Sequence, residues 1–116
     1  MKIKKALQMM KSLADDTRLR IVHLLNEEEL SVTEISDILD VQQSNLSKHL
    51  SRLRLTGLVN DSREGFNVYY SLARTKDKFH KELLKAITSG LAENEILQMD
   101  LEKMKEVLGK TRSAGQ

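Results

Sequence analysis

The side chains best suited to bind a ligand are concentrated in one stretch, Gln42–Gly57, with the sequence QQSNLSKHLSRLRLTG. In a helix, where successive residues are about 100° apart, Leu46, Leu50 and Leu53 share one face. Hydroxyl, amide and cationic groups occupy the opposite face, and residues 41–60 include no Asp or Glu. Such groups suit phosphate oxygens and base edges in the major groove of DNA. The stretch predicts a DNA-reading helix, although an ordinary surface helix with a solvated serine-rich face would show the same pattern.

The segment before this stretch predicts the first half of a helix-turn-helix. Ser31 and Glu34 match a capping box, in which a serine and a glutamate three residues later bind the first backbone amides of a helix. We therefore expect a short helix ending at Leu39, a turn at residues 40–41, and then the DNA-reading helix over residues 42–56. Two short helices joined by a tight turn, the second of them basic, are typical of this motif.

A β-hairpin is expected directly after the DNA-reading helix, over residues 58–72. Residues 58–63 can form one strand, Glu64 and Gly65 the turn, and residues 66–72 a second strand rich in β-branched and aromatic side chains. A hairpin in this position is called a wing. Arg63 at its tip could contact a phosphate group or the minor groove.

The remaining helices are predicted at Ile3–Leu13, Arg18–Asn26, residues 75–89 and Asn94–Leu108. The helix at Arg18–Asn26 is apolar most of the way round, which indicates the central helix of the core. His23 in this helix is interpreted as structural rather than as a ligand. The predicted fold class is mostly α with a small β-hairpin wing, a winged helix-turn-helix with helical dimerisation at both ends.

Three segments are expected along the chain. Residues 1–91 would form the winged-helix DNA-binding domain with dimerisation helices, residues 92–109 a C-terminal helix for dimerisation or linkage, and residues 110–116 a flexible tail. The chain of 116 residues is long enough for one small domain with a modest core. That core must consist of Leu, Ile, Val and Met, because the chain has two Phe, two Tyr and no Trp.

Composition excludes several classes of function. The absence of Cys excludes disulfides, thiolate metal sites and thiol redox sensing, and it is compatible with a reducing cytoplasm. No apolar run approaches the roughly 18 residues of a transmembrane helix. No catalytic residue or cofactor is expected, because the chain has no Gly-rich phosphate loop and no paired nucleophile and base.

The net charge is only +2, but charge is segregated along the chain. Residues 1–20 carry six basic and two acidic side chains, and residues 21–40 carry six acidic side chains without Lys or Arg.

Four segments of the chain resemble the ArsR/SmtB family of bacterial and archaeal winged-helix repressors: LADDTRLRIVHLL, ELSVTEISDIL, QQSNLSKHLSRLRLTGLV and REGFNVYYSL. The resemblance runs in register from Ala6 to Leu84, and SKHL followed by LR and GLV is the recognition-helix signature of the family. It implies a cytoplasmic homodimer, built from the first and fifth helices, that binds a palindromic operator in double-stranded DNA.

The resemblance also assigns roles to individual residues. Gln43, Ser44 and Ser47 are expected to contact bases, and the cationic side chains are expected to contact phosphate groups. His49 lies about 60° from the centre of the leucine stripe, so it either faces the edge of the groove or packs at the flank of the helix. The expected DNA-binding residues are Gln43, Ser44, Asn45, Ser47, Lys48, His49, Arg52, Arg54 and Arg63. The expected dimer-interface residues are Ile3, Leu7, Met10, Phe79, Leu83, Ile87, Leu97 and Leu101.

The chain departs from the family at both of its known metal sites. Ser31 and Thr33 stand where some relatives have Cys, and hydroxyl groups are poor ligands for thiophilic metals. Where other relatives have a His and carboxylate set near the fifth helix, this chain has Arg74, Lys76, Ile87 and Gly90.

Asp77 and His80 could share a helix face, but two ligands alone make a weak metal site. No metal is therefore expected, and no residue identifies an inducer. In the wing, Phe66 replaces an Arg that many relatives carry after the turn glycine. Phosphate contact by the wing is expected to be weaker than usual.

Two other interpretations stay open. Winged helices also serve as protein-interaction modules, although a protein-binding face would have no need to exclude carboxylates from residues 41–60. The C-terminal sequence LEKMKEVLGKTRSAG resembles the linker helix of relatives in which this domain is fused to an S-adenosylmethionine-dependent methyltransferase. The chain could therefore be a DNA-binding domain excised from such a fusion.

Overall fold

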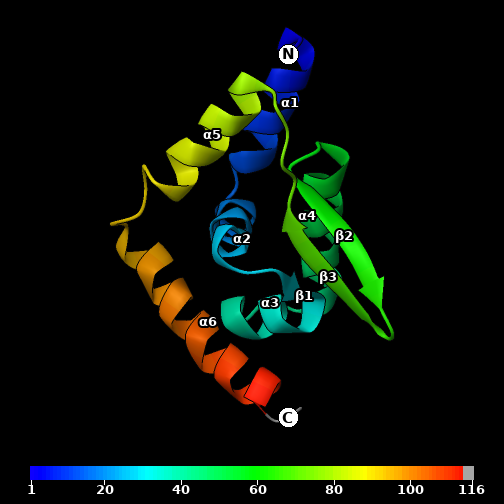
Figure 1. Cartoon of the computed structure of the whole chain (residues 1–116), viewed down its shortest axis with the longest axis vertical. Coiled ribbons are helices and arrows are strands. Elements are labelled where there is room, and N and C mark those ends of the chain that lie inside the picture. The colour runs from blue at the N-terminus through cyan, green and yellow to red at the C-terminus, as the bar shows by residue number, and fades with distance from the viewer. Residues whose placement is uncertain (114–116) are drawn as a thin grey trace.

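The computed structural model describes residues 1–113 of the chain, which form six helices and three strands (Figure 1). In chain order the elements are α1 (Ile3–Leu13), α2 (Asp16–Glu27), β1 (Leu30–Ser31), α3 (Val32–Leu39), α4 (Gln43–Leu55), β2 (Val59–Glu64), β3 (Asn67–Leu72), α5 (Lys78–Thr88) and α6 (Glu95–Ser113). The predicted fold class, a mostly helical winged helix-turn-helix, is confirmed. No helix among the described residues is long and apolar enough to cross a membrane.

The helix α2 is the centre of the core, as predicted. All five residues from 21 to 25 are buried, and α2 packs against α1, α4, α5, α6 and β3. Asp15 caps its first turn, where the carboxylate accepts a hydrogen bond from the Arg18 amide at 3.0 Å. Because α2 touches elements from both ends of the chain, it holds α4 and the terminal helices in one body.

The helices α3 and α4 form the predicted helix-turn-helix. The capping box is complete: the Glu34 amide donates to Ser31 Oγ at 3.1 Å, and the Ser31 amide donates to Glu34 Oε1 at 2.9 Å. Asp40 ends α3 in the left-handed conformation with a φ of 54°, which Asp tolerates better than most residues. The Ser36 hydroxyl then donates to the Val41 carbonyl at 2.6 Å. The tight turn before α4 is therefore fixed by local bonds.

The strands β2 and β3 form the predicted wing. They pair antiparallel, with Val59 opposite Leu72 at the base and Glu64 opposite Asn67 at the tip. Gly65 closes the turn with a φ of 64°, a conformation that glycine adopts without strain.

A third strand, β1, was not predicted. Its two residues pair with Tyr70 and Tyr69 of β3, which gives the sheet the order β1-β3-β2. A two-residue strand is too short to show periodicity in the sequence. Its effect is to anchor the middle of β3 to the segment that leads into α3.

The C-terminal helix α6 is longer than predicted. It continues to Ser113 instead of ending at Leu108, so residues 110–113 of the expected tail are helical, and residues 114–116 lie outside the described residues. The expectation of a helix end rested on Gly109, which is a weak helix former. Tertiary contacts override this preference, because Met104 and Val107 are buried in the core as α6 packs along α2 and α3.

Ion pairs near both of its ends fasten α6 to the rest of the chain. Near its start, Asp100 accepts two hydrogen bonds of 2.8 Å from Arg20 of α2. Near its end, Glu34 of α3 accepts bonds of 3.1 Å from the Thr111 hydroxyl and 3.2 Å from the Arg112 guanidinium. The buried Glu34 carboxylate thus caps α3 and binds α6 at the same time.

We predict that Glu34→Gln lowers the free energy of unfolding at pH 7 by about 1–3 kcal/mol, the usual cost of disrupting a buried charged hydrogen bond. Burial works to raise the pKa of Glu34, but bonds from Arg112, the Ser31 amide and Thr111 outweigh it and hold the pKa below its ordinary value of 4.5. The stabilisation is therefore present above the unfolded-state pKa and is lost as the pH falls through the folded-state pKa. Urea unfolding at pH 7, 5 and 3.5 should show the two proteins converging at low pH.

The matched control for this prediction is Glu106→Gln on the exposed surface of α6. Glu106 pairs with Lys103 at 3.6 Å and Lys110 at 3.7 Å, and we expect a change within about 0.5 kcal/mol because exposed pairs contribute little. Equal effects of the two substitutions, or a Glu34 effect that does not depend on pH, would contradict the role assigned to Glu34.

Candidate nucleic-acid interface

The outer face of α4 carries most of the predicted DNA-binding residues. Leu46, Leu50 and Leu53 are fully buried and face the core. The side chains left on the solvent side are all exposed: Gln43, Ser44, Asn45, Ser47, Lys48 and Arg52. One helix therefore presents amide, hydroxyl and cationic groups together, the set that suits base edges and phosphates.

The start of α4 adds backbone donors to this face. Gln42 precedes the first turn but makes no side-chain hydrogen bond to it, and the first turn contains no acidic residue. The amides at a helix start carry partial positive charge and favour anions such as phosphate. The N-terminal end of α4 is thus suited to a phosphate group of a bound duplex.

His49 packs at the flank of α4 and does not lie on its exposed face. Its Nδ1 is 3.1 Å from the Arg18 guanidinium and 3.7 Å from an Asp15 carboxylate oxygen. Because a guanidinium can only donate, Nδ1 accepts from Arg18. The Arg18 Nε also donates to the Ser12 carbonyl at 2.6 Å. The sequence left two placements open for His49, the edge of the groove and the flank of the helix, and the structure shows the second. At the flank, His49 orients α4 against the start of α2.

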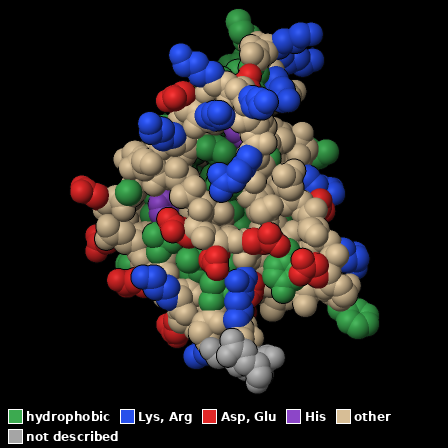
Figure 2. Space-filling view, in the orientation of Figure 1, with side chains coloured by type: hydrophobic (Ala, Val, Ile, Leu, Met, Phe, Trp, Pro, Cys, Tyr) green, Lys and Arg blue, Asp and Glu red, His purple; other side chains and the backbone are tan. Residues whose placement is uncertain are grey.

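The two remaining predicted arginines lie near the wing. Arg54 pairs with Asp61 of β2 at 3.3 Å, and both side chains are exposed. Such a pair is weak, so a phosphate group could replace the carboxylate. Arg63 is exposed near the tip of the wing. Beyond it, Phe66 is fully exposed, and a hydrophobic side chain stands out from the wing tip in Figure 2.

One neighbour of this interface was not assigned to it from the sequence. Lys2, Lys4 and Lys5 of the N-terminal segment line a hollow of about 250 Å³ together with Leu55 and Thr56 at the end of α4. The basic side chains of α1 therefore continue the positive surface of α4. The signal in the sequence was the excess of basic residues in positions 1–20, but only the fold shows that α1 begins beside the end of α4.

The predicted dimer-interface residues fall into two groups. Ile3, Leu7 and Met10 leave 78%, 47% and 41% of their surface exposed, because Met9 rather than Met10 faces the core. Three further side chains, Phe79, Leu83 and Leu101, are half-buried.

Ile87 and Leu97 are different from the other predicted interface residues. They are only 6% and 2% exposed within the single chain, because α5 and α6 pack against its own core. The interface expectation for these two side chains is therefore corrected: their surface is already covered and is not available to a second copy. On α6 the exposed apolar side chains are instead Ile96 and Met99.

Both histidines considered as metal ligands are buried. His80 is buried and its Nε2 is 3.1 Å from the Ala73 carbonyl, while Asp77 accepts a bond from the His80 amide as the cap of α5. His23 is buried in the core, and burial lowers its pKa against the opposing effects of Glu27 and Asp100. Among residues 1–113, no group of three or more His, Cys, Asp or Glu is arranged to hold a metal ion.

Comparison with known proteins points to one family. Residues 15–61, which span the helix-turn-helix, match the family described as "Bacterial regulatory protein, arsR family". The transcriptional activator HlyU of Vibrio cholerae is 45% identical over 80 residues, which cover 69% of this chain and 74% of HlyU. The biofilm growth-associated repressor of Agrobacterium fabrum is 37% identical over 86 residues, which cover 74% of each chain.

Solved structures agree with this result. The structure of reduced HlyU from Vibrio cholerae has a TM-score of 0.66 and 38% identity, and covers 79% of this chain and 90% of its own. A homodimeric winged helix-turn-helix DNA-binding domain from Mycobacterium bovis, described as a possible ArsR-family regulator, has a TM-score of 0.66 and 27% identity. It covers 80% of this chain and 83% of its own.

The wing yields a prediction with a matched pair of variants. We expect Arg63→Ala to lower the slope of log affinity for duplex DNA against log salt by roughly 1, because one phosphate contact is lost. Phe66→Ala should weaken binding about fivefold without changing that slope, because an apolar contact with the groove is lost. Fluorescence anisotropy at several salt concentrations measures both quantities. Wild-type affinity in Phe66→Ala would mean that the wing tip does not touch DNA.

Proposed function

Because the chain belongs to the ArsR family of DNA-binding transcriptional regulators, we propose that it acts as a homodimeric repressor at a palindromic operator. The observation that carries this proposal is the division of α4 into a buried leucine face and an exposed face of polar and cationic side chains. Its relatives are regulators of transcription rather than enzymes. The site of action is therefore proposed to be the cytoplasm, where bacterial DNA is found.

The role of α4 is to enter the major groove. Gln43, Ser44 and Ser47 lie in its first two turns, where the recognition helix of such motifs contacts base edges, and Asn45 can contact the adjacent backbone. Lys48 and Arg52 are exposed on the same helix and are assigned to phosphate groups, as are Arg54 and Arg63 nearer the wing. His49 supports this surface from the flank through its contact with Arg18.

The homodimer is proposed to form through the apolar side chains that the single chain leaves uncovered. Ile3, Leu7 and Met10 of α1 are the largest such group on one element. Phe79 and Leu83 of α5 are half-buried, and α5 begins near the start of α1, where the Met1 ammonium is 3.3 Å from Asp77; both helices lie at the same end of the molecule (Figure 1). A homodimeric relative from Mycobacterium bovis has the same fold. Two-fold symmetry would place two α4 helices in successive major grooves about 34 Å apart.

Repression is proposed as the direction of control. An operator-bound dimer blocks a promoter by occupancy alone, and the exposed polar face of α4 and the exposed apolar side chains of α1 support such occupancy. Relatives include both an activator and a repressor, so the direction is a property to be measured with a reporter gene placed behind the selected operator. Lower expression in the presence of the chain is the expected result, and higher expression would make it an activator.

The experiment that tests DNA recognition is selection of duplexes from a random library by the full chain, followed by fluorescence anisotropy. We expect the selected sites to contain two inverted half-sites, bound by two chains per duplex, and a scrambled duplex to bind at least about 1,000-fold more weakly. Arg52→Ala should weaken binding to all duplexes and lower the salt slope by roughly 1. Lys103→Ala, on the far helix α6, is the matched control and should leave the slope unchanged.

Two outcomes would contradict this assignment. Loss of discrimination between duplexes with an unchanged salt slope in Arg52→Ala would make Arg52 a base contact and not a phosphate contact. Failure of the wild-type chain to enrich any site, with no binding even at low salt, would overturn the DNA-binding proposal and favour a protein-interaction module.

A further inference from the structure

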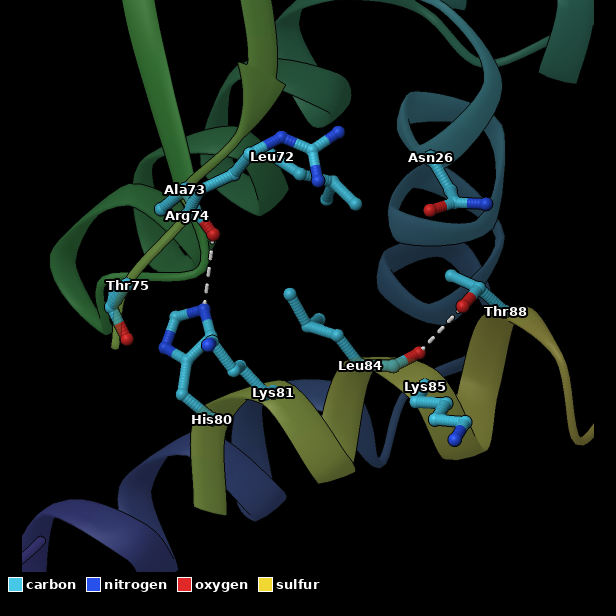
Figure 3. Close-up of a pocket in the computed structure, with 10 residues that line it drawn as sticks. All are labelled: Asn26, Leu72, Ala73, Arg74, Thr75, His80, Lys81, Leu84, Lys85 and Thr88. Atoms are coloured by element: carbon cyan, nitrogen blue, oxygen red, sulfur yellow. Dashed lines mark hydrogen bonds between the residues drawn. The ribbon is translucent and has the colours of Figure 1, made fainter. Parts of the chain in front are cut away.

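A cavity of about 300 Å³ lies between the last turn of α2, the end of β3 and α5 (Figure 3). Its apolar lining comes from Leu72, Ala73 and Leu84. Arg74, Lys81 and Lys85 add three cations, and no Asp or Glu is among the lining residues. The cavity therefore joins a hydrophobic floor to a positively charged rim.

The three cations have no acidic partner in the described part of the chain. The ion pairs of Lys and Arg side chains among residues 1–113 involve other residues, namely Arg18, Arg20, Arg54, Lys103, Lys110 and Arg112. Figure 2 shows basic side chains gathered on this face around α5. In a chain with 17 acidic side chains, a rim of three cations without a carboxylate is a strong local excess of positive charge.

The wall of the cavity is held in place by bonds that need no ligand. The buried His80 ring bonds the Ala73 carbonyl at 3.1 Å, and this fixes the loop after β3 to the start of α5. Asp77 in the same loop caps α5 and pairs with the N-terminal ammonium of Met1 at 3.3 Å. A preformed wall lowers the entropic cost of binding.

The polar groups at the mouth are also arranged for a ligand. In Figure 3 the side chains of Arg74, Leu84 and Asn26 project toward the same opening from the loop after β3, from α5 and from α2. Thr88 donates its only hydroxyl hydrogen to the Leu84 carbonyl at 2.9 Å, so it has no donor left for an anionic group. The Asn26 amide can donate or accept.

We propose that this cavity binds a small organic anion, with its apolar part on Leu84 and Leu72 and its carboxylate or phosphate group against Arg74 and Lys81. A guanidinium binds either anionic group through two parallel hydrogen bonds. The volume lies at the lower end of the range for small-molecule sites, which fits a molecule built on a single ring.

The position of the cavity gives the bound anion a regulatory use, and this step rests on the proposed function. One wall is the end of β3, which continues into the wing, and the other is α5, which lies beside the proposed dimer interface. A ligand that binds both walls favours one placement of the wing relative to the dimer. If the anion binds the free protein and the DNA-bound protein with affinities that differ by a given factor, it must change the affinity of the protein for DNA by that same factor.

The test is a titration of the full chain with benzoate and with phenyl phosphate, followed by amide chemical shifts in NMR spectra. We expect saturable binding of at least one anion with a Kd of about 1 mM or lower, and shifts centred on residues 72–75 and 80–88. Benzamide, which has the shape of benzoate without its charge, should bind at least about tenfold more weakly because the charge-assisted bonds are lost.

Variants in α5 and in the loop before it test the site and provide the control. Arg74→Gln and Lys81→Gln should each weaken binding of the anion about tenfold. Lys78→Gln removes the same charge from α5 at a position outside the cavity lining and should change the affinity by less than about twofold. Linear shifts without saturation, equal binding of benzamide, or shifts centred on α4 would each overturn the site.

The regulatory step is tested separately with the selected operator duplex. A saturating concentration of the anion should change the Kd for DNA at least about fivefold, the lower end of usual allosteric coupling. An unchanged Kd would overturn the regulatory use while the binding site stands. Failure of the chain to bind any duplex would overturn the proposed function, and the NMR result on the free chain would remain valid.

Discussion

Burial of the leucine stripe of α4 is the constraint on which the proposed DNA surface depends. Leu46, Leu50 and Leu53 are fully buried, and each buried leucine stabilises the fold by roughly 1.5–3 kcal/mol. Rotation of α4 by one residue would expose this stripe and bury Arg52 or Arg54, depending on the direction, which is strongly unfavourable for an unpaired charge. The polar face of α4 therefore points outward, because the leucine face must stay buried. The contact between Arg18 and His49 holds the flank of α4 in the same orientation.

The C-terminal helix α6 connects this constraint to the rest of the molecule. Glu34 receives bonds from the Ser31 amide at the cap of α3 and from Arg112 near the end of α6. The placement of α3, and through it of the turn before α4, thus depends on a helix from the other end of the chain. A regulator whose DNA-reading helix is braced in this way can respond to changes among its outer helices, since interfaces of packed helices tend to shift between discrete arrangements.

The parts of the fold that the sequence could predict are those set by local patterns. The leucine stripe of α4, the capping box at Ser31 and the glycine turn at Gly65 each require only neighbouring residues, and all three are present in the structure. The contacts that could not be predicted join distant segments: Arg20 binds Asp100 across 80 positions, and Arg112 binds Glu34 across 78. The same gap explains the extension of α6 and the burial of its apolar side chains, since periodicity shows that a face is apolar but not which surface covers it.

The measurement that tests the central claim most directly is methylation interference on the selected operator, because methylation of guanine N7 blocks contacts in the major groove. If two α4 helices lie in successive major grooves, methylated guanines should be depleted from the bound DNA in two clusters centred about 10–10.5 base pairs apart. Bound DNA that retains methylated guanines throughout the site would contradict major-groove recognition by α4. Depletion in a single cluster would contradict the paired arrangement of the two chains.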